Sequence, residues 1–346
     1  MYKKYLIAEI AQAHNGSFDK AMSYIKALSD TGVDAIKFQM HIADAESSLQ
    51  EPFRIPMPGY ASRMDYWRAM EFNIAQWGAL KEQCEAHGME FLCSPFSNIA
   101  VDILQQLQVQ CYKVGSGEVN NGLLLERLSR TGKPIILSSG MSSLEELDHA
   151  VRFLRDKDSP VSVMQCTTAY PTQPEQYGLN MIRELKARYG IPVGFSDHSA
   201  HPETCLAAVA LGAELLEFHV ILDAHDTSGP DASSSLTVAQ VRDLVKGVRR
   251  LERAMANPVD KTSATSFKDL KQIFEKSLAV NKHLPKGHVL GFEDLEAKKP
   301  KGFGIDARDY KRVVGHRLNK ELRQWDFLTK HDISDDEIAA SLRCSQ

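Results

Sequence analysis

The sequence predicts a (β/α)₈ barrel, an α/β fold, followed by a small C-terminal domain. Short runs of β-branched and apolar residues alternate with longer amphipathic stretches eight times between residues 5 and 256. Strands that are apolar along their whole length are typical of parallel sheets covered on both faces. Eight such units in about 250 residues fit a closed barrel better than an open doubly wound sheet, although periodicity alone does not show closure.

The helix candidates lie between the strand candidates. The stretches 19–32 and 73–88 are amphipathic and end on glycine, which commonly terminates helices. The stretches 142–156 and 237–255 have the same helical spacing. The expected strands are 5–11, 35–41, 90–94, 111–116, 134–139, 162–167, 192–196 and 215–220.

The pattern changes after Met255, where a polar stretch carries no strand signal. We therefore expect a barrel domain over residues 1–256 and a linker over residues 257–277. The remaining segment, 278–346, has short strands separated by glycine and proline. This pattern predicts a compact domain of roughly 70 residues, too small to be the main catalytic body.

Composition favours a protein that acts on small molecules. The net charge is −4, and no run of Lys and Arg predicts binding to nucleic acid or to an anionic membrane. No apolar run approaches the roughly 20 residues that span a bilayer, so we expect a cytoplasmic location. The six cysteines form no CxxC pair, and we expect all of them, Cys344 included, to be reduced packing residues.

Polar residues gather where the predicted strands end, and the C-terminal ends of barrel strands share one face. Lys37 and Lys113 stand among apolar residues, where an ammonium is costly unless an anion meets it. Either lysine alone is equally well explained by snorkelling or by a salt bridge. Together with the hydroxyls of Ser94, Ser116 and Ser139, they favour a pocket for a phosphate or a carboxylate.

His198 and His219 are the candidates for metal ligands. A single strand-end histidine is more often a structural residue, so the metal interpretation needs both together. Two neutral imidazoles with open positions would bind Mn²⁺, Fe²⁺ or Zn²⁺ and form a Lewis-acid site. Glu9 and Glu118 suit acid–base catalysis or recognition of hydroxyl groups, and they equally suit salt bridges with the lysines.

These residues and their motifs resemble the sialic acid synthase family, which includes N-acetylneuraminate synthase and its legionaminate and pseudaminate relatives. The resemblance covers nearly the whole chain through "IAEIAQAHNG", "DAIKFQMH", "FLCSPFS", "YKVGSGE", "GKPIILSSGM", "QCTTAYPTQP", "GFSDHS", "GAELLEFHV" and "GPDASSSL". It implies a barrel with an antifreeze-like (SAF) domain, in a domain-swapped homodimer where that domain caps the partner's active site. The implied reaction condenses phosphoenolpyruvate with N-acetylmannosamine or a related hexose, giving a nine-carbon 2-keto-3-deoxy sugar acid and phosphate.

The resemblance also implies roles for single residues. Glu118 matches the acidic residue that handles protons at the reacting centre. His198 and His219 match the ligands of a divalent metal, usually Mn²⁺, with Mg²⁺ or Co²⁺ as alternatives. The sugar-contacting positions are Glu9, Tyr170 and Asp231. The phosphoenolpyruvate pocket is matched by Lys37, Ser94, Lys113, Ser116, Ser139, Thr168 and Ser196.

Three departures from the family pattern bear on the sugar more than on the reaction. Thr168 stands at a phosphate-side position where bacterial members often have Asn. Lys299 replaces the SAF-domain arginine that reaches the partner's sugar, and lysine cannot make the same bidentate contact. The segment "EFHVILDAHDTSGPD" differs from the common "ERHFT" version around the second histidine.

The residues leave two other functions open. A pyruvate-dependent aldolase would use Lys37 or Lys113 as a Schiff-base nucleophile. An inactive barrel would leave the SAF domain as a carbohydrate-binding module, but the retained lysines, histidines and glutamates favour an enzyme. The role of Asp197 is also open, between orienting a neighbour and capping the next helix.

Overall fold

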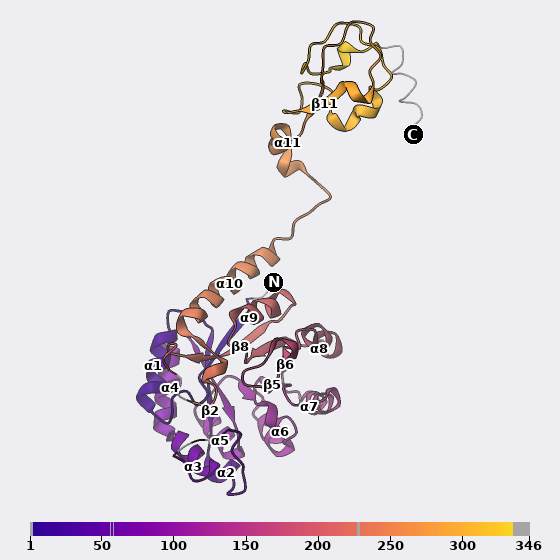
Figure 1. Ribbon diagram of the computed structural model, residues 1–346. Helices are drawn as coiled ribbons and strands as arrows, with labels where there is room; N and C mark the ends of the chain where they lie inside the picture. The colour runs from indigo at the N-terminus through magenta and orange to yellow at the C-terminus, as the bar shows by residue number, and fades with distance from the viewer. Residues whose placement is uncertain (1–2, 56, 58, 227–228, 335–346) are drawn as a thin grey trace. The chain divides into compact units, whose positions relative to one another are not determined.

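The structure is a computed structural model that describes residues 3–55, 57, 59–226 and 229–334. The chain divides into two compact units, Met1–Pro258 and Val259–Gln346. In the first unit, eight parallel strands form a closed barrel, because the first strand pairs with the second and also with the eighth. Figure 1 shows the helices of this unit arranged around the strands. The predicted (β/α)₈ barrel is therefore confirmed.

The barrel strands follow the chain order around the sheet. The fourth strand is shorter than the expected segment 111–116, because the chain turns at Gly115 into a 3₁₀ helix over Ser116–Glu118. An unexpected short strand, β9 (Ser235–Thr237), pairs in parallel with the eighth strand. The eight barrel strands are β1 Tyr5–Glu9, β2 Ala35–Met40, β3 Glu90–Pro95, β4 Tyr112–Val114, β5 Ile135–Ser138, β6 Val161–Gln165, β7 Val193–Asp197 and β8 Leu215–Ile221.

The helices of this unit begin and end at local signals in the sequence. Ser143 and Glu146 form a capping box, in which each side chain accepts a hydrogen bond from the other residue's backbone N–H. Gly190 ends a later helix with a φ of 62°, which glycine adopts without strain. The helices are α1 Phe18–Leu28, α2 Ala43–Glu46, α3 Arg63–Met70, α4 Ile74–Ala86, α5 Asn98–Gln106, α6 Gly122–Ser129, α7 Leu144–Asp156, α8 Met181–Tyr189, α9 Pro202–Ala210 and α10 Val238–Ala256.

The interior of the barrel is layered, because alternate residues of each strand point inward. One layer is apolar and fully buried, and it includes Ile7, Ala35, Leu92, Ile136 and Met164. The inward positions two residues further along the strands carry mostly polar groups, at the end where active sites of such barrels lie. These groups are Glu9, Lys37, Ser94, Lys113, Ser138 and Glu217.

The second unit has a small apolar core of its own. Strand β10 (Ser277–Val280) pairs in antiparallel fashion with β11 (Leu295–Lys298). A short helix, α11 (Lys268–Phe274), occupies part of the segment expected to be a linker. Residues 335–346 of the expected C-terminal domain lie outside the described residues. The core residues of this unit include Leu278, Val280, Leu284, Leu290, Leu318 and Leu328.

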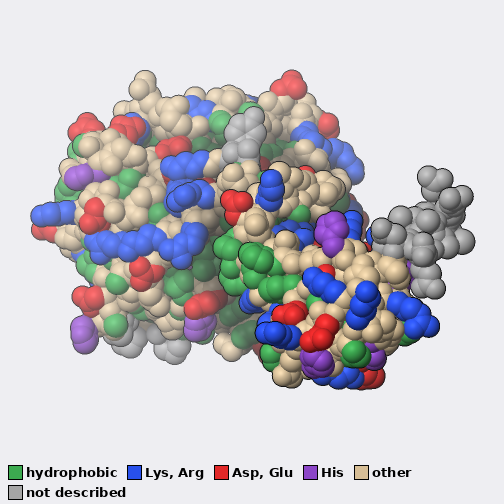
Figure 2. Space-filling model, turned by 90° about the horizontal axis from the view of Figure 1, so that it is seen from above, with side chains coloured by type: hydrophobic (Ala, Val, Ile, Leu, Met, Phe, Trp, Pro, Cys, Tyr) green, Lys and Arg blue, Asp and Glu red, His purple; other side chains and the backbone are tan. Residues whose placement is uncertain are grey.

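The surface shows no large region of one charge on the face in Figure 2, where basic and acidic side chains are interspersed. Among the described residues, no helix is both long enough and apolar enough to cross a membrane. Five cysteines are free thiols, and all but the half-buried Cys111 are buried. The sixth, Cys344, lies outside the part of the chain that the structure describes.

Replacing Gly194 in β7 by Ala should destabilise the barrel, because the interior has no room for a Cβ at this position. The added atom would lie 2.8 Å from the Cβ and from the carbonyl oxygen of Leu215, and 3.0 Å from Met164 Cε. Overpacking of this kind typically lowers the free energy of unfolding by about 1–3 kcal/mol. A denaturant titration followed by circular dichroism measures the loss.

The matched control is Gly122→Ala in the first turn of α6, where an added Cβ meets nothing within 4 Å. This variant should be at least as stable as the wild type, because alanine favours helix more than glycine does. If both variants lost the same free energy of unfolding, the close contact between β7 and β8 would be contradicted.

Candidate active site

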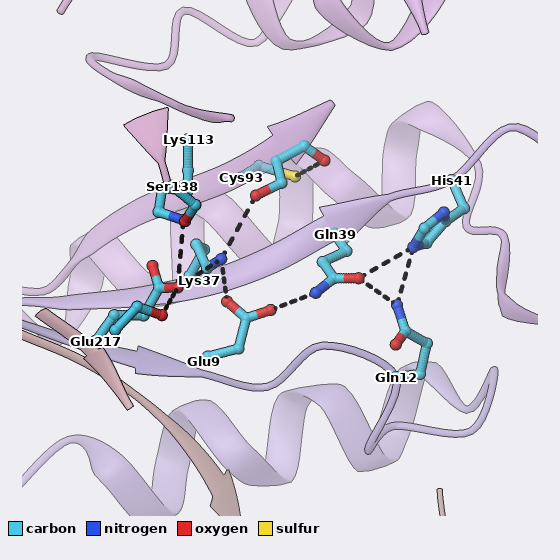
Figure 3. A network of polar contacts seen from close by, with 11 residues as sticks. Glu9, Gln12, Lys37, Gln39, His41, Cys93, Lys113, Ser138 and Glu217 are labelled. Atoms are coloured by element: carbon cyan, nitrogen blue, oxygen red, sulfur yellow. Dashed lines mark hydrogen bonds and ion pairs between the residues drawn. The ribbon is translucent and has the colours of Figure 1, made fainter. Parts of the chain in front are cut away.

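The mouth of the barrel holds two buried lysines and two buried glutamates (Figure 3). Lys37 Nζ lies 2.7 Å from Glu9 Oε2 and 3.2 Å from Glu217 Oε1. Lys113 Nζ lies 3.4 Å from the same oxygen of Glu217. None of the four residues is more than 4% exposed. We call these four residues the charge cluster, and its two positive and two negative charges balance.

Burial and neighbouring charges shift the pKa values within the charge cluster. Burial lowers the pKa of Lys37 to about 8; the carboxylate of Glu217 opposes this shift, whereas the ammonium of Lys113 adds to it. Burial alone would raise the pKa of Glu217, but Lys113 and Lys37 hold it well below its usual range. At neutral pH, therefore, Glu217 is ionised and Lys37 is mostly protonated.

Hydroxyl groups surround the charge cluster, as a site for an oxyanion requires. Each comes from the polar end of a different barrel strand, so the closed sheet brings them to one point. The contacts are Lys113 Nζ to Ser138 Oγ, Lys37 Nζ to Ser94 Oγ at 3.5 Å, and Ser196 Oγ to Glu217 Oε1 at 2.9 Å.

Two members of this arrangement, Ser138 and Glu217, are absent from the site residues that the sequence predicts. Both lie two positions beyond the apolar layer of their strands, so counting inward positions with a period of two would have identified them. The predicted residue Ser139 follows Ser138, and its hydroxyl lies 3.3 Å from Gln165 Oε1.

His198 and His219 lie close together at the ends of β7 and β8, with ring centroids 5.2 Å apart. The ring of Tyr170 stacks on His198 at a centroid distance of 4.3 Å. His198 Nδ1 lies 2.8 Å from the carbonyl oxygen of Thr167, a contact that places the ring proton on Nδ1 and leaves Nε2 as the lone-pair nitrogen. Burial lowers the pKa of His198 to about 3 and also lowers the pKa of His219.

Two neutral imidazoles are suitable ligands for a divalent metal ion. Among the described residues, no group of three or more His, Cys, Asp or Glu side chains is arranged to hold a metal. The donor set of His198 and His219 therefore fits an open site, whose other positions would be filled by water or substrate, rather than a closed structural site.

Arg54, from the loop between α2 and α3, extends the aromatic stack on His198. Its guanidinium carbon lies 4.4 Å from the centroid of the Tyr170 ring. Its Nη2 donates a hydrogen bond to Asp231 Oδ1 at 2.8 Å. The structure thus brings together Tyr170 and Asp231, two of the residues predicted to contact the sugar. Arg54 is not among the site residues predicted from the sequence, because a loop arginine has no periodic signal.

A cavity of about 720 Å³ opens at this end of the barrel. Glu118 lines it, and burial raises the pKa of this carboxyl group. Asn121 Nδ2 donates a hydrogen bond to Glu118 Oε2 at 2.7 Å, and within the described residues no lysine forms an ion pair with this glutamate. The lysines of the charge cluster are not among the lining residues. The lining includes Gln39, Arg54, Ser116, Thr168, Tyr170, His219 and Asp231.

Gly140 allows two predicted phosphoenolpyruvate-binding residues to come together. An added Cβ at this position would lie 2.4 Å from Thr168 Oγ1 and 2.6 Å from Ser116 Oγ. The backbone N–H of Gly140 also donates to Ser116 Oγ at 3.1 Å. The absence of a side chain is therefore a requirement of the geometry.

Two further residues considered in the sequence analysis, Lys299 and Asp197, have contacts that do not involve the charge cluster. Lys299 belongs to the second unit, where it is exposed and its Nζ lies 5.0 Å from the centroid of the Phe274 ring. Asp197 accepts a hydrogen bond from Ser199 Oγ at 2.9 Å. It does not cap α9, because the residue at that helix start is His201.

The sequence matches the NeuB family over residues 24–260, more than half of the chain. The chain belongs to the NeuB family. It is 31% identical to N-acetylneuraminate-9-phosphate synthase of Homo sapiens over 318 residues, 91% of this chain and 88% of that protein. It is 30% identical to N,N'-diacetyllegionaminic acid synthase of Campylobacter jejuni over 331 residues, 94% of this chain and 98% of that protein.

A solved structure agrees with the family and with the fold. N-acetylneuraminic acid (sialic acid) synthetase from Leptospira borgpetersenii, crystallised in complex with citrate, matches with a TM-score of 0.69 and 27% identity. The match covers 78% of this chain and 91% of that chain. The resemblance to the sialic acid synthase family is confirmed, and this protein is an enzyme of the NeuB synthase family.

Replacing Glu217 by Gln in this NeuB-family enzyme should destabilise it, because the change removes the carboxylate shared by two buried lysines. Removing one partner of a buried ion pair typically costs about 3–5 kcal/mol of the free energy of unfolding. Inorganic phosphate should restore part of this loss, since an anion that binds only the folded state stabilises it. Denaturant titrations with and without phosphate measure both effects.

Asp243→Asn serves as the control, because the Asp243–Lys246 pair is exposed to solvent. Exposed pairs contribute at most about 1 kcal/mol, and phosphate should leave this variant no more stabilised than the wild type. A Glu217→Gln protein as stable as Asp243→Asn would contradict the role assigned to the charge cluster.

Proposed function

We propose that this enzyme condenses phosphoenolpyruvate with N-acetylmannosamine or a related hexose. The products are a nine-carbon 2-keto-3-deoxy sugar acid of the sialic acid type and phosphate. The observation that carries this proposal is the placement of Lys37 and Lys113 around one carboxylate at the barrel mouth, near the paired His198 and His219. Phosphoenolpyruvate has two anionic groups, a phosphate and a carboxylate, and this site has two ammonium groups.

In this proposal, phosphoenolpyruvate binds at the charge cluster. Its anionic groups interact with Lys37 and Lys113, and hydroxyl donors complete the pocket. Because Glu9 and Glu217 already balance the lysines, the ligand would add a net charge of about −2.5 to −3. This excess favours a divalent cation nearby, which supports a metal site at the two histidines. The hydroxyl donors are those of Ser94, Ser116, Ser139, Thr168 and Ser196.

The proposed reaction forms one carbon–carbon bond and replaces the carbon–oxygen bond from C2 to phosphate by one from C2 to the oxygen of water. C3 of phosphoenolpyruvate attacks the aldehyde carbon of the open-chain sugar, whose oxygen takes up a proton. Water adds at C2 and loses one proton, and the resulting hydroxyl loses its proton as phosphate leaves, which gives the 2-keto group; the two protons balance those taken up by the sugar oxygen and by phosphate. Glu118 is proposed to move a proton at this centre, and the rise of its pKa on burial supports this role. A Mn²⁺, Mg²⁺ or Co²⁺ ion held by His198 and His219 would polarise the aldehyde.

The sugar is proposed to lie in the cavity, which Tyr170 and Asp231 line, and to reach Glu9, which is buried behind the lining residue Gln39. Segment 278–346 is proposed as the antifreeze-like domain of a cytoplasmic, domain-swapped homodimer, joined through the linker 257–277 to the barrel domain 1–256. In that dimer Lys299 would approach the sugar of the partner subunit. The coverage of the synthases named above, which extends over most of the chain, supports this organisation.

The test is phosphate release from phosphoenolpyruvate in the presence of Mn²⁺ and a panel of acceptors. The panel contains N-acetylmannosamine, mannose and a diacetamido hexose, because the family pattern leaves the acceptor open. Mass spectrometry should find a product with the mass of phosphoenolpyruvate, sugar and water together, less phosphoric acid. No phosphate release with any acceptor would overturn the proposal.

A second candidate, a Schiff-base aldolase, is favoured by the lowered pKa of Lys37, because desolvated lysines are typical nucleophiles. Borohydride added with pyruvate would trap a reduced covalent adduct in an aldolase. We expect no adduct on Lys37 or Lys113, and we expect phosphate release instead. An adduct on either lysine would favour the aldolase.

The pH dependence of kcat/KM for phosphoenolpyruvate should report on Lys37. Only the ammonium form attracts the anionic substrate, and its pKa is about 8. Glu9 and Glu217 face this group as carboxylates and Lys113 faces it as a cation. Above pH 8, kcat/KM should therefore fall by about tenfold per pH unit.

Lys37→Arg is the matched variant, because a guanidinium stays protonated throughout this range. Its kcat/KM should be lower at pH 7, owing to the different shape, but should lose the alkaline decline. The same decline in both proteins would show that another group titrates.

A further inference from the structure

His41, directly after β2, is held between two aromatic rings. The ring of Trp67 on α3 stacks on one face at 3.9 Å, and the ring of Phe96 after β3 stacks on the other at 4.4 Å. Both stacks are within 15° of parallel, and His41 is only 5% exposed. Both ring faces are covered, so only the two edge nitrogens of this imidazole are available for polar contacts.

Each nitrogen of His41 has a polar partner, and the partners fix the position of the ring proton. Nδ1 lies 2.6 Å from Glu46 Oε1. A carboxylate only accepts, so Nδ1 donates a proton to Glu46, and in the neutral ring Nε2 is an acceptor. Nε2 lies 2.9 Å from Gln12 Nε2, which donates to it, and 3.1 Å from Gln39 Oε1, the oxygen that both side chains face.

The orientation of one amide group then sets that of the next, as Figure 3 shows. The second N–H of the Gln12 amide donates to Gln39 Oε1 at 2.6 Å. With its oxygen fixed in this way, the Gln39 amide presents Nε2 to Glu9, and it donates to Glu9 Oε1 at 2.7 Å. The hydrogen bond between Glu46 and His41 therefore sets the direction of the hydrogen bonds that follow. These bonds run through His41, Gln12 and Gln39 and end at Glu9.

This contact matters because Glu9 has a competing partner. Glu9 Oε2 pairs with Lys37, while Oε1 is held by Gln39, which also lines the cavity. Without Gln39, both oxygens of Glu9 would be free to turn toward the ammonium of Lys37. The amide therefore holds one carboxylate oxygen of Glu9 away from Lys37 and against Gln39, a residue of the cavity lining.

We propose that His41 is a positioning residue, which with Glu46 holds Glu9 for the sugar through Gln12 and Gln39. This inference rests on the proposed function, in which Glu9 contacts the sugar. All four supporting side chains line the cavity, and the double-mutant cycle below separates an action through Glu9 from a direct contact with the sugar. The aromatic clamp of Trp67 and Phe96 keeps the imidazole from rotating, so the hydrogen bonds retain one direction.

The test is His41→Phe, which preserves a flat ring between Trp67 and Phe96 but removes both nitrogens. We expect kcat/KM for the sugar to fall about 10–100-fold, as for other residues that orient a ligand-contacting group. KM for phosphoenolpyruvate should change less than about twofold, because Lys37 keeps its contact with Glu217. His149→Phe on the exposed face of α7 is the control and should leave both constants unchanged.

A double-mutant cycle with Glu9→Gln separates positioning from a general structural effect. If His41 acts through Glu9, adding His41→Phe to Glu9→Gln should lower kcat/KM by less than about threefold. Independent, multiplicative losses would overturn the inference, as would a His41→Phe enzyme with wild-type sugar kinetics. If His41→Phe does not fold, Glu46→Gln takes its place in the cycle, with an expected loss of about 3–10-fold.

The outcome for the wild type separates this inference from the proposed function. A wild-type enzyme that releases phosphate, with multiplicative losses in the cycle, overturns only the role of His41. A wild-type enzyme that releases no phosphate with any acceptor overturns the proposed function, and the inference with it.

Discussion

The burial of two lysines against one shared carboxylate is the interaction on which the candidate site depends. Removing charges from water costs several kcal/mol per ion, so each ammonium must meet an acceptor at close range. Glu217 meets both, at 3.2 Å from Lys37 and 3.4 Å from Lys113. The three residues come from β8, β2 and β4, which converge on one interior only because the sheet is closed by the pairing of β1 with β8.

The barrel interior has separate apolar and charged layers, because the buried charges need partners at one level of the barrel. An apolar layer that includes Ile7 and Leu92 is fully buried, and the charge cluster lies one inward position further along the strands. Rigid strands thus hold Lys37, Lys113, Ser94 and Ser196, whereas Ser116, Ser139 and Thr168 follow shortly after strands. The groups at the sugar end, such as Arg54 and Tyr170, come instead from loops. Loops vary more readily than strands, which fits relatives that are all named synthases but of different sugar acids.

Much of this arrangement was predictable from the sequence, and the failures have identifiable causes. Lys37, Lys113 and the paired histidines stood out because polar residues at the ends of apolar strands need partners. Glu217 and Ser138 are also polar residues at strand ends, but the sequence assigned them no role, although the two-residue period places them inward. Arg54 had no signal at all, because its contact with Asp231 joins residues 177 positions apart. The sequence also allowed each of the two predicted glutamates to form a salt bridge with a lysine. Glu9 does so with Lys37, whereas Glu118 accepts a hydrogen bond from Asn121.

The sequence by itself determined the alternation of strands and helices, the change of pattern after Met255 and the family, because these are carried by local periodicity and ordered motifs. Only the tertiary structure decided that the sheet closes and that one carboxylate serves two lysines. It also decided that His41, at the wall of the cavity, is clamped between the rings of Trp67 and Phe96. The physical reason is that hydrogen-bond direction and ion pairing depend on distances of a few ångströms between residues far apart in the chain.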